Sequence, residues 1–225
     1  MVQEQYVIIV AGGIGSRMKS DRPKQFIELA GIPIIVRTLQ CFLNYNPSIR
    51  IIISVHKNYK THLEGLLEKF ELKDADIKIT FGGDSRFASV KNGLQLIENA
   101  DAIVGIHDAA RPFVSIQTIT NCYDAALEKG IAIPCIAMNE SLRKISNNIN
   151  NSVNRNEYKI IQTPQCFLVS KIKRAFEQEY SEFFTDDATV LESTGEKIVL
   201  VEGNEENIKI TSPHDLLIAN AMLSK

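Results

Sequence analysis

The chain has 225 residues, of which 44% are hydrophobic and 23% charged, a composition typical of a globular protein with one sizeable core. Its formal net charge of -2 argues against a protein that binds nucleic acid non-specifically, because such proteins normally carry a strong basic excess. Apolar runs such as "GIPIIV" are too short to span a bilayer, and the first residues show no signal-peptide pattern, so we expect a cytoplasmic protein that does not contact membranes.

Short runs rich in β-branched residues alternate along the chain with segments of helical period. The runs that predict strands are residues 6–11, 50–55, 76–81, 101–108, 131–137 and 197–203. The segments that predict helices are residues 34–45, 61–70 and 85–97, followed by helices that open at Ser115, Thr185 and Ser212. This alternation predicts an α/β fold with a doubly wound, mostly parallel sheet, and we expect residues 1–225 to form one domain.

Three loops that follow predicted strands are rich in glycine or in charged residues. They are "AGGIGSRM" after the first strand, "GGD" at 82–84 and "HDAARP" at 107–112. Ligands of open parallel sheets bind beyond the carboxyl ends of the strands, and those ends lie along one edge. We therefore expect the three loops to converge on one crevice.

Residues 141–165 break the alternation, because two strand-like stretches surround a middle that is rich in asparagine. This pattern predicts a protruding β-hairpin. A mobile surface loop is the plainer alternative, since asparagine and serine are common turn residues.

The first glycine-rich loop could belong to several kinds of binding site. A P-loop is excluded, because the spacing G-x-x-x-x-G-K-[ST] does not occur. A dinucleotide fingerprint is disfavoured, because Met18 stands where a third glycine should follow Gly13 and Gly15. Lys57, after the second strand, would suit a 2′-phosphate, so an NADP-dependent reductase is kept as an alternative.

The residue types of this loop fit a phosphate loop for a nucleoside triphosphate. Its glycines allow backbone N–H groups to approach an anion, and Arg17, Lys19, Arg22 and Lys24 supply positive charge. Pro23 fixes the backbone just before Lys24. The plainer alternative is a strand-to-helix turn whose basic residues face solvent.

Several motifs, in a fixed order, resemble one family along nearly the whole chain. They are "AGGIGSRM", "RPKQF", "GGDSRFASV", "HDAARPFV", "QTPQ", "FFTDDATVLE" and "VEGNEENIKIT". Together they resemble the cytidylyltransferases that form 4-diphosphocytidyl-2-C-methyl-D-erythritol in non-mevalonate isoprenoid synthesis. The D-ribitol-5-phosphate cytidylyltransferases share the first motif and are the alternative. The four residues between Met18 and Pro23, Ala110 and "TDDA" favour the erythritol enzymes.

The resemblance implies a Rossmann-like nucleotidyltransferase fold and transfer of CMP from CTP to 2-C-methyl-D-erythritol 4-phosphate, with release of pyrophosphate. The catalytic residues that it implies are Arg17, Lys24 and Lys209. The CTP-binding residues that it implies are Ala11, Gly12, Gly13, Gly15, Gly82, Asp84, Ser89 and Asp108. The residues that it implies for binding the polyol phosphate are Arg111, Ser141, Arg155, Thr163 and Thr185.

The resemblance further implies that residues 139–162 form a dimerisation arm, through which Arg155 and Ser141 reach the site of a second subunit in a homodimer. Two positions depart from the family pattern. Ser141 stands where threonine is usual, and Gly12 replaces a frequent alanine.

The implied reaction needs cations more than it needs a base. A phosphate monoester has its second pKa near ~6, so the attacking phosphate is already ionised at neutral pH. The sequence agrees, because its histidines are scattered at positions 56, 62, 107 and 214, which favours core or surface roles. Its four cysteines stand singly without a C-x-x-C pair, which predicts small buried hydrophobic residues in a reducing compartment. Joining two polyanions demands positive charge and positioning, and we expect Mg²⁺ held mainly through phosphates. A non-catalytic sensor of the same fold would bind CTP without releasing pyrophosphate.

Overall fold

A computed structural model describes residues 3–13, 23–147 and 149–224. Its central feature is an eight-stranded sheet in the order β10-β7-β11-β6-β1-β4-β5, with β12 paired to β7. The strands are β1 (Gln5–Ala11), β4 (Arg50–Val55), β5 (Ile77–Phe81), β6 (Ile103–Asp108), β7 (Ile131–Ala137), β10 (Lys159–Ile161), β11 (Gln165–Leu168) and β12 (Leu200–Glu202). Only the pairings of β10 and β11 with their neighbours are antiparallel within this sheet. The predicted α/β fold with a mostly parallel sheet is confirmed.

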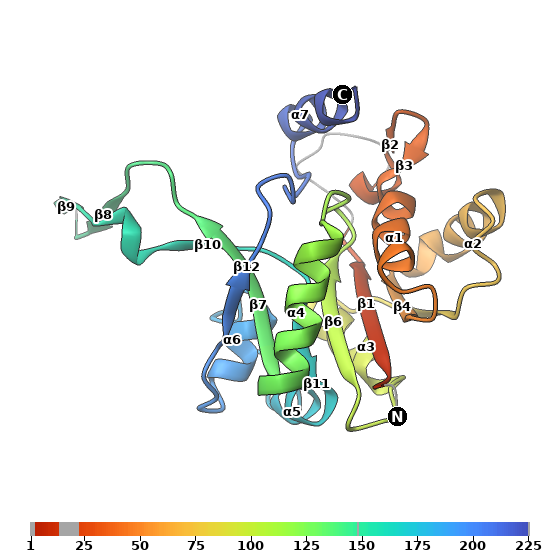
Figure 1. Cartoon of the computed structure of the whole chain (residues 1–225), viewed down its shortest axis with the longest axis horizontal. Helices are drawn as coiled ribbons and strands as arrows, with labels where there is room; N and C mark the ends of the chain where they lie inside the picture. Colours follow the sequence, from red (N-terminus) through yellow and green to blue (C-terminus); the bar gives the residue numbers. More distant parts are fainter. Residues whose placement is uncertain (1–2, 14–22, 148, 225) are drawn as a thin grey trace.

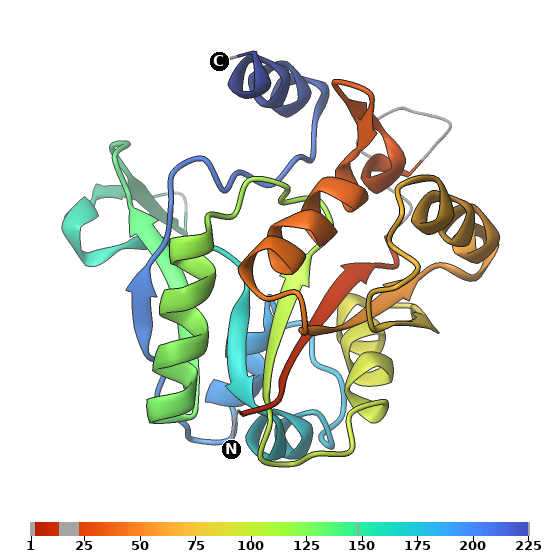
Figure 2. The ribbon, with the colours of Figure 1, turned by 45° about the vertical axis from the view of Figure 1, so that its right-hand side comes forward.

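Helices cover both faces of the sheet (Figures 1 and 2). They are α1 (Ile34–Tyr45), α2 (Lys60–Lys69), α3 (Arg86–Gln95), α4 (Ile116–Lys129), α5 (Val169–Ala175), α6 (Asp187–Glu192) and α7 (Pro213–Leu223). Alternate residues of β1 point to opposite faces of the sheet. Val7 and Ile9 belong to the core between the sheet and α1, α2 and α4. Ile8 belongs to the core between the sheet and α3, α5 and α6. A strand buried on both faces explains the continuous apolar run that the sequence shows.

Helix α3 packs close to the sheet at a glycine. A Cβ on Gly93 would lie 2.9 Å from Cγ2 of Ile8, so a larger residue would push the helix away from β1. The helix begins beside the carboxyl ends of the strands, where Ser85 accepts a hydrogen bond from the backbone N–H of Ala88 at 3.0 Å. This contact fixes the start of α3 at the edge where ligands are expected.

Two of the three predicted helix caps are confirmed, and one is wrong. Ser115 caps α4 and Ser212 caps α7, as predicted. The prediction that Thr185 caps the next helix is wrong, because Asp186 is the cap of α6 and accepts from the backbone N–H of Thr189 at 2.9 Å. The hydroxyl of Thr189 accepts from the N–H of Asp186 in return, and this reciprocal pair places the start one residue later.

Strand β11 is the main element that the sequence did not predict. It enters between β6 and β7 and runs antiparallel to both. The chain comes to it directly from β10 without a crossover helix, so the pattern of alternating strands and helices gives no signal for it.

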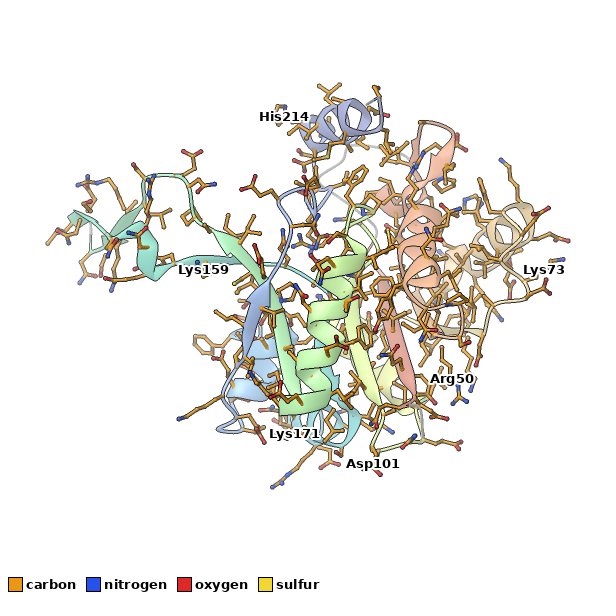
Figure 3. All side chains as sticks on the ribbon, viewed as in Figure 1. Arg50, Lys73, Asp101, Lys159, Lys171 and His214 are labelled. Atoms are coloured by element: carbon orange, nitrogen blue, oxygen red, sulfur yellow. The ribbon has the colours of Figure 1, made fainter. Side chains whose placement is uncertain are left out.

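The predicted hairpin is present and protrudes from the body (Figure 1). It contains β8 (Arg143–Ser146) and β9 (Ile149–Ser152), which among the described strands pair only with each other, and a short 3-10 turn, η4 (Arg155–Glu157). Figure 3 shows Lys159 where this arm rejoins the sheet. Ile145 is 76% exposed and Ile149 is 64% exposed, so the arm presents aliphatic side chains to solvent within one chain.

Within the described ranges, no helix is both long enough and apolar enough to cross a membrane. The four cysteines are free thiols, of which Cys122 and Cys166 are buried and Cys41 and Cys135 are half-buried.

Candidate active site

A cavity of about 520 Å³ opens beyond the carboxyl ends of β1, β4 and β6 and against the start of α3. Loops after β1, β5 and β6 all contribute to its wall, so the three loops do converge on one crevice. The sequence-predicted residues that line it are Ala11, Gly12, Gly13, Lys24, Asp84, Ser89, Asp108 and Lys209.

Glycines and one hydroxyl bring two loops together at one end of the cavity. The hydroxyl of Ser89 accepts from the N–H of Gly83 at 3.1 Å and donates to the carbonyl of Ser85 at 2.9 Å. A Cβ on Gly12 would lie 2.9 Å from Ser89 Oγ, and one on Gly82 would lie 3.0 Å from the Cα of Gly12. Both glycines are therefore needed for the approach, which leaves a surface made largely of backbone.

Lys24 reaches the cavity from a short 3-10 turn, η2 (Lys24–Phe26). The next residue, Gln25, is buried, and its Nε2 donates to the carbonyl oxygens of Ala11 at 2.7 Å and Gly13 at 3.1 Å. These two bonds tie the turn to the end of β1. Lys24 is thus anchored at the cavity by its neighbour.

Three cations surround the carboxylate of Asp108 at the end of β6. Lys209 Nζ lies 2.9 Å and Arg111 Nε 3.3 Å from its Oδ2, and Arg86 Nε lies 3.5 Å from its Oδ1. Burial alone would raise the pKa of Asp108, but the charges of Arg86, Lys209 and Arg111 outweigh it and hold the pKa well below its usual range. Asp108 is therefore an anion at neutral pH that orients the surrounding cations.

Arg86 also makes a bidentate ion pair with a second carboxylate. Its Nη1 and Nη2 each lie 2.7 Å from an oxygen of Asp187, at the first position of α6. Burial raises the pKa of Asp187, and the contact with Arg86 opposes that rise. The fork geometry of arginine suits this two-point contact, which lysine cannot reproduce.

Further polar groups support Asp108 from behind the cavity. Thr163 Oγ1 accepts from the backbone N–H of Asp108 at 3.2 Å and lies 3.0 Å from Nδ1 of His107. Arg111 Nη1 donates to the carbonyl of Asn207 at 2.7 Å, and Asn207 Nδ2 donates to the carbonyl of Thr163 at 2.8 Å. Burial lowers the pKa of His107 to about 4, so this ring stays neutral and has a core role, as expected.

Not all predicted site residues meet at the cavity within one chain. Ser141 and Arg155 lie on the arm, which projects away from the body (Figure 1). Thr185 lines a different cavity, of about 590 Å³, beside α6 and β12. Gly15 and Arg17 lie outside the described residues.

Several residues that line the cavity were not predicted to belong to the site, and among them Gln25, His56 and Arg86 carry the largest polar side chains. A signal was available for each, because each lies within a few residues of a strand end or inside a motif such as "GGDSRFASV". Lys57, which the dinucleotide alternative required, is exposed and does not line the cavity. The structure therefore does not favour that alternative.

Comparisons with known proteins agree along the whole chain. The family model described as IspD, 2-C-methyl-D-erythritol 4-phosphate cytidylyltransferase, matches residues 5–225. Proteins of that name from Bacteroides thetaiotaomicron and Bacteroides fragilis are 44% and 45% identical, over 98% and 96% of this chain and 100% and 98% of their own lengths.

Solved structures agree with the sequence comparisons. The 4-diphosphocytidyl-2C-methyl-D-erythritol synthase of Anaerococcus prevotii superposes with a TM-score of 0.86 at 28% identity, covering 99% of this chain and 97% of that one. The 2-C-methyl-D-erythritol 4-phosphate cytidylyltransferase of Francisella tularensis superposes with a TM-score of 0.78 at 33% identity, covering 97% and 99%. The chain thus belongs to the 2-C-methyl-D-erythritol 4-phosphate cytidylyltransferase family.

Proposed function

We propose that the protein transfers CMP from CTP to 2-C-methyl-D-erythritol 4-phosphate, which yields 4-diphosphocytidyl-2-C-methyl-D-erythritol and pyrophosphate. The observation that carries this proposal is a single cavity that combines Lys24 and Lys209 with a glycine-lined strand end. Membership of the family supports it, since the curated relatives carry the name of this activity.

The chemistry is a substitution at the α-phosphorus of CTP. A phosphate oxygen of the acceptor forms the new P–O bond, and the bond from the α-phosphorus to the bridging oxygen of pyrophosphate breaks. The acceptor phosphate is largely a dianion at neutral pH, because its second pKa is near ~6. No side chain has to remove a proton, which suits a site whose buried histidine is neutral.

The main barrier is repulsion between two polyanions. Two like unit charges 4 Å apart repel by about 4 kcal/mol at an effective dielectric constant of about 20. Lys24, Lys209 and Arg17 would offset this repulsion and stabilise the charge on the α-phosphoryl group. The ammonium of Lys209 has three donors, so its contact with Asp108 leaves donors for a phosphate.

The cytosine would lie against the surface formed by Gly12, Gly82 and Ser89. A flat ring can approach backbone closely there, because side chains are absent at both glycines. The exposed carboxylate of Asp84, at the same cavity, would accept from the amino group of cytosine, and Ala11 would contribute backbone.

The residues at the cavity fit a magnesium ion that is held mainly by phosphates. No group of three or more histidine, cysteine or acidic side chains among the described residues could hold a metal by itself. Mg²⁺ typically keeps several waters and takes few protein ligands, so such a donor set is compatible with it. When bound, the ion would neutralise charge on the triphosphate.

The acceptor would bind between two chains of a homodimer. Arg111, Thr163 and Thr185 would come from one chain, and Ser141 and Arg155 from the arm of the other, residues 139–162. The exposed aliphatic side chains of the arm support this proposal, because they would be buried by a second copy.

We also propose that residues 1–225 act as one domain in the cytosol. The four free thiols suit a reducing compartment, where structural disulfides are rare.

Pyrophosphate release is expected from purified protein given CTP, Mg²⁺ and 2-C-methyl-D-erythritol 4-phosphate, and not when D-ribitol 5-phosphate replaces that acceptor. Chromatographic separation of pyrophosphate and the cytidine-containing product from CTP measures it directly, with chelation of the metal by EDTA as the control that should stop it. Release only with D-ribitol 5-phosphate would instead identify the protein as a D-ribitol-5-phosphate cytidylyltransferase. Binding of CTP without release would indicate a nucleotide sensor.

A further inference from the structure

Arg86 connects two parts of the molecule that are far apart in sequence. It is the first residue of α3, immediately after the cap residue Ser85, and it lines the cavity. Its two terminal nitrogens hold both oxygens of Asp187 at 2.7 Å, while its Nε lies 3.5 Å from Oδ1 of Asp108. The side chain of Arg86 is 29% exposed and that of Asp187 only 1%.

The two carboxylates belong to different halves of the proposed site. Asp108 contacts Lys209 and Arg111 through its other oxygen, Oδ2. Asp187 follows Thr185 by two residues, in the segment proposed to contact the polyol phosphate. A planar guanidinium that engages both carboxylates fixes the angle between them, because its donors cannot rotate independently.

The segment around Thr185 has a second attachment on its other side. Gln165 Nε2 donates to Oδ2 of Asp186 at 2.8 Å, and Gln165 Oε1 accepts from the N–H of Ala188 at 2.9 Å. The start of α6 is thus held between β11 and the guanidinium of Arg86. Removing the arginine would take away the contact that ties this start to the cavity side.

We propose that Arg86 is a positioning residue, which keeps Asp108 at the nucleotide side and the Thr185 segment at the acceptor side in register. Its two terminal nitrogens are hydrogen-bonded to Asp187 and its Nε is ion-paired with Asp108, so it acts through these residues more than through contact with a substrate. This inference rests on the proposed function.

Asp187 provides the matched test, because it holds Arg86 and does not line the cavity. In Arg86→Met and in Asp187→Asn, we expect kcat/KM for the polyol phosphate to fall by about 10- to 100-fold, since a small misplacement of reacting groups has a cost of that size. KM for CTP should change less than about threefold in Asp187→Asn. Arg86→Lys should recover only part of the loss, since lysine keeps the charge but not the fork.

A double variant distinguishes positioning from direct contact. If the pair acts as a unit, Arg86→Met with Asp187→Asn should be no worse than either single change. An unchanged acceptor KM and kcat in Asp187→Asn, together with a large loss in Arg86→Met, would overturn the proposal and make Arg86 a substrate-binding residue. Equal losses of kcat/KM for CTP and for the acceptor in Asp187→Asn would also overturn the proposal.

Folding and the proposed function are checked separately. Thermal melting and CTP binding by calorimetry report whether each variant is folded, and Asp187→Asn and Arg86→Lys remain informative if Arg86→Met does not fold. Absence of activity in the wild-type protein with both substrates would refute the proposed function, whereas the outcomes above compare variants with an active wild type.

Discussion

Replacing Lys24 by alanine is expected to lower kcat by about 1000-fold, which is the loss seen when a transition-state cation is removed from other phosphoryl transfers. The reason is electrostatic. Lys24 is anchored at the cavity by its neighbour Gln25, so its charge is held in place before the substrates bind. The measurement is the steady-state rate of pyrophosphate release at saturating CTP and acceptor.

The matched control for this prediction is Lys69→Ala, which removes an exposed lysine of α2 that does not line the cavity. It should retain normal turnover and so separate a local effect from a change in net charge. Arg17→Ala is expected to behave like Lys24→Ala. Near-normal kcat in both Lys24→Ala and Arg17→Ala would show that these cations do not have the assigned role.

Replacing Arg155 by alanine is also expected to abolish most turnover, although Arg155 lies on the arm and not at the cavity of its own chain. In the proposed homodimer each site takes its body from one subunit and its arm from the other. A dimer of Arg155→Ala with Lys24→Ala therefore has one site with both residues intact and one with neither. Random exchange gives such mixed dimers half of the total, so about a quarter of wild-type activity should return.

Subunit exchange must be verified in the same sample, for example by native mass spectrometry of chains with different tags. Two controls are the single variants incubated alone, which should remain inactive. If mixed dimers form and activity does not return, the site is not shared between subunits.

Much of the fold could be predicted from the sequence, because burial on both faces leaves a clear signal. Residues 50–55 form β4 and residues 34–45 form α1 with the predicted bounds. The convergence of three loops also followed from a general property of parallel sheets, that the carboxyl ends of the strands share an edge. The family resemblance of the ordered motifs assigned Lys24, Asp108 and Lys209 to the site, and all three residues line one cavity.

The remaining features depend on contacts between distant residues, which no local pattern encodes. Strand β11 is not preceded by a crossover helix, so the alternation of strands and helices did not predict it. Arg86 and Asp187 are 101 positions apart in the sequence. From the sequence alone, Arg86 therefore could not be distinguished from any other charged residue at the start of a helix. Helix α6 starts one residue later than predicted. Threonine and aspartate are both favourable cap residues, and Asp186 is the cap because it pairs with Thr189.

The arm has a consequence for how the reaction would respond to the amount of protein. Because each proposed site needs a side chain from a second copy, a lone chain would carry an incomplete site. Turnover per chain would then fall on dilution, and it would recover when the chains are concentrated again. Abundance would act as a threshold for this activity, in addition to the supply of its two substrates.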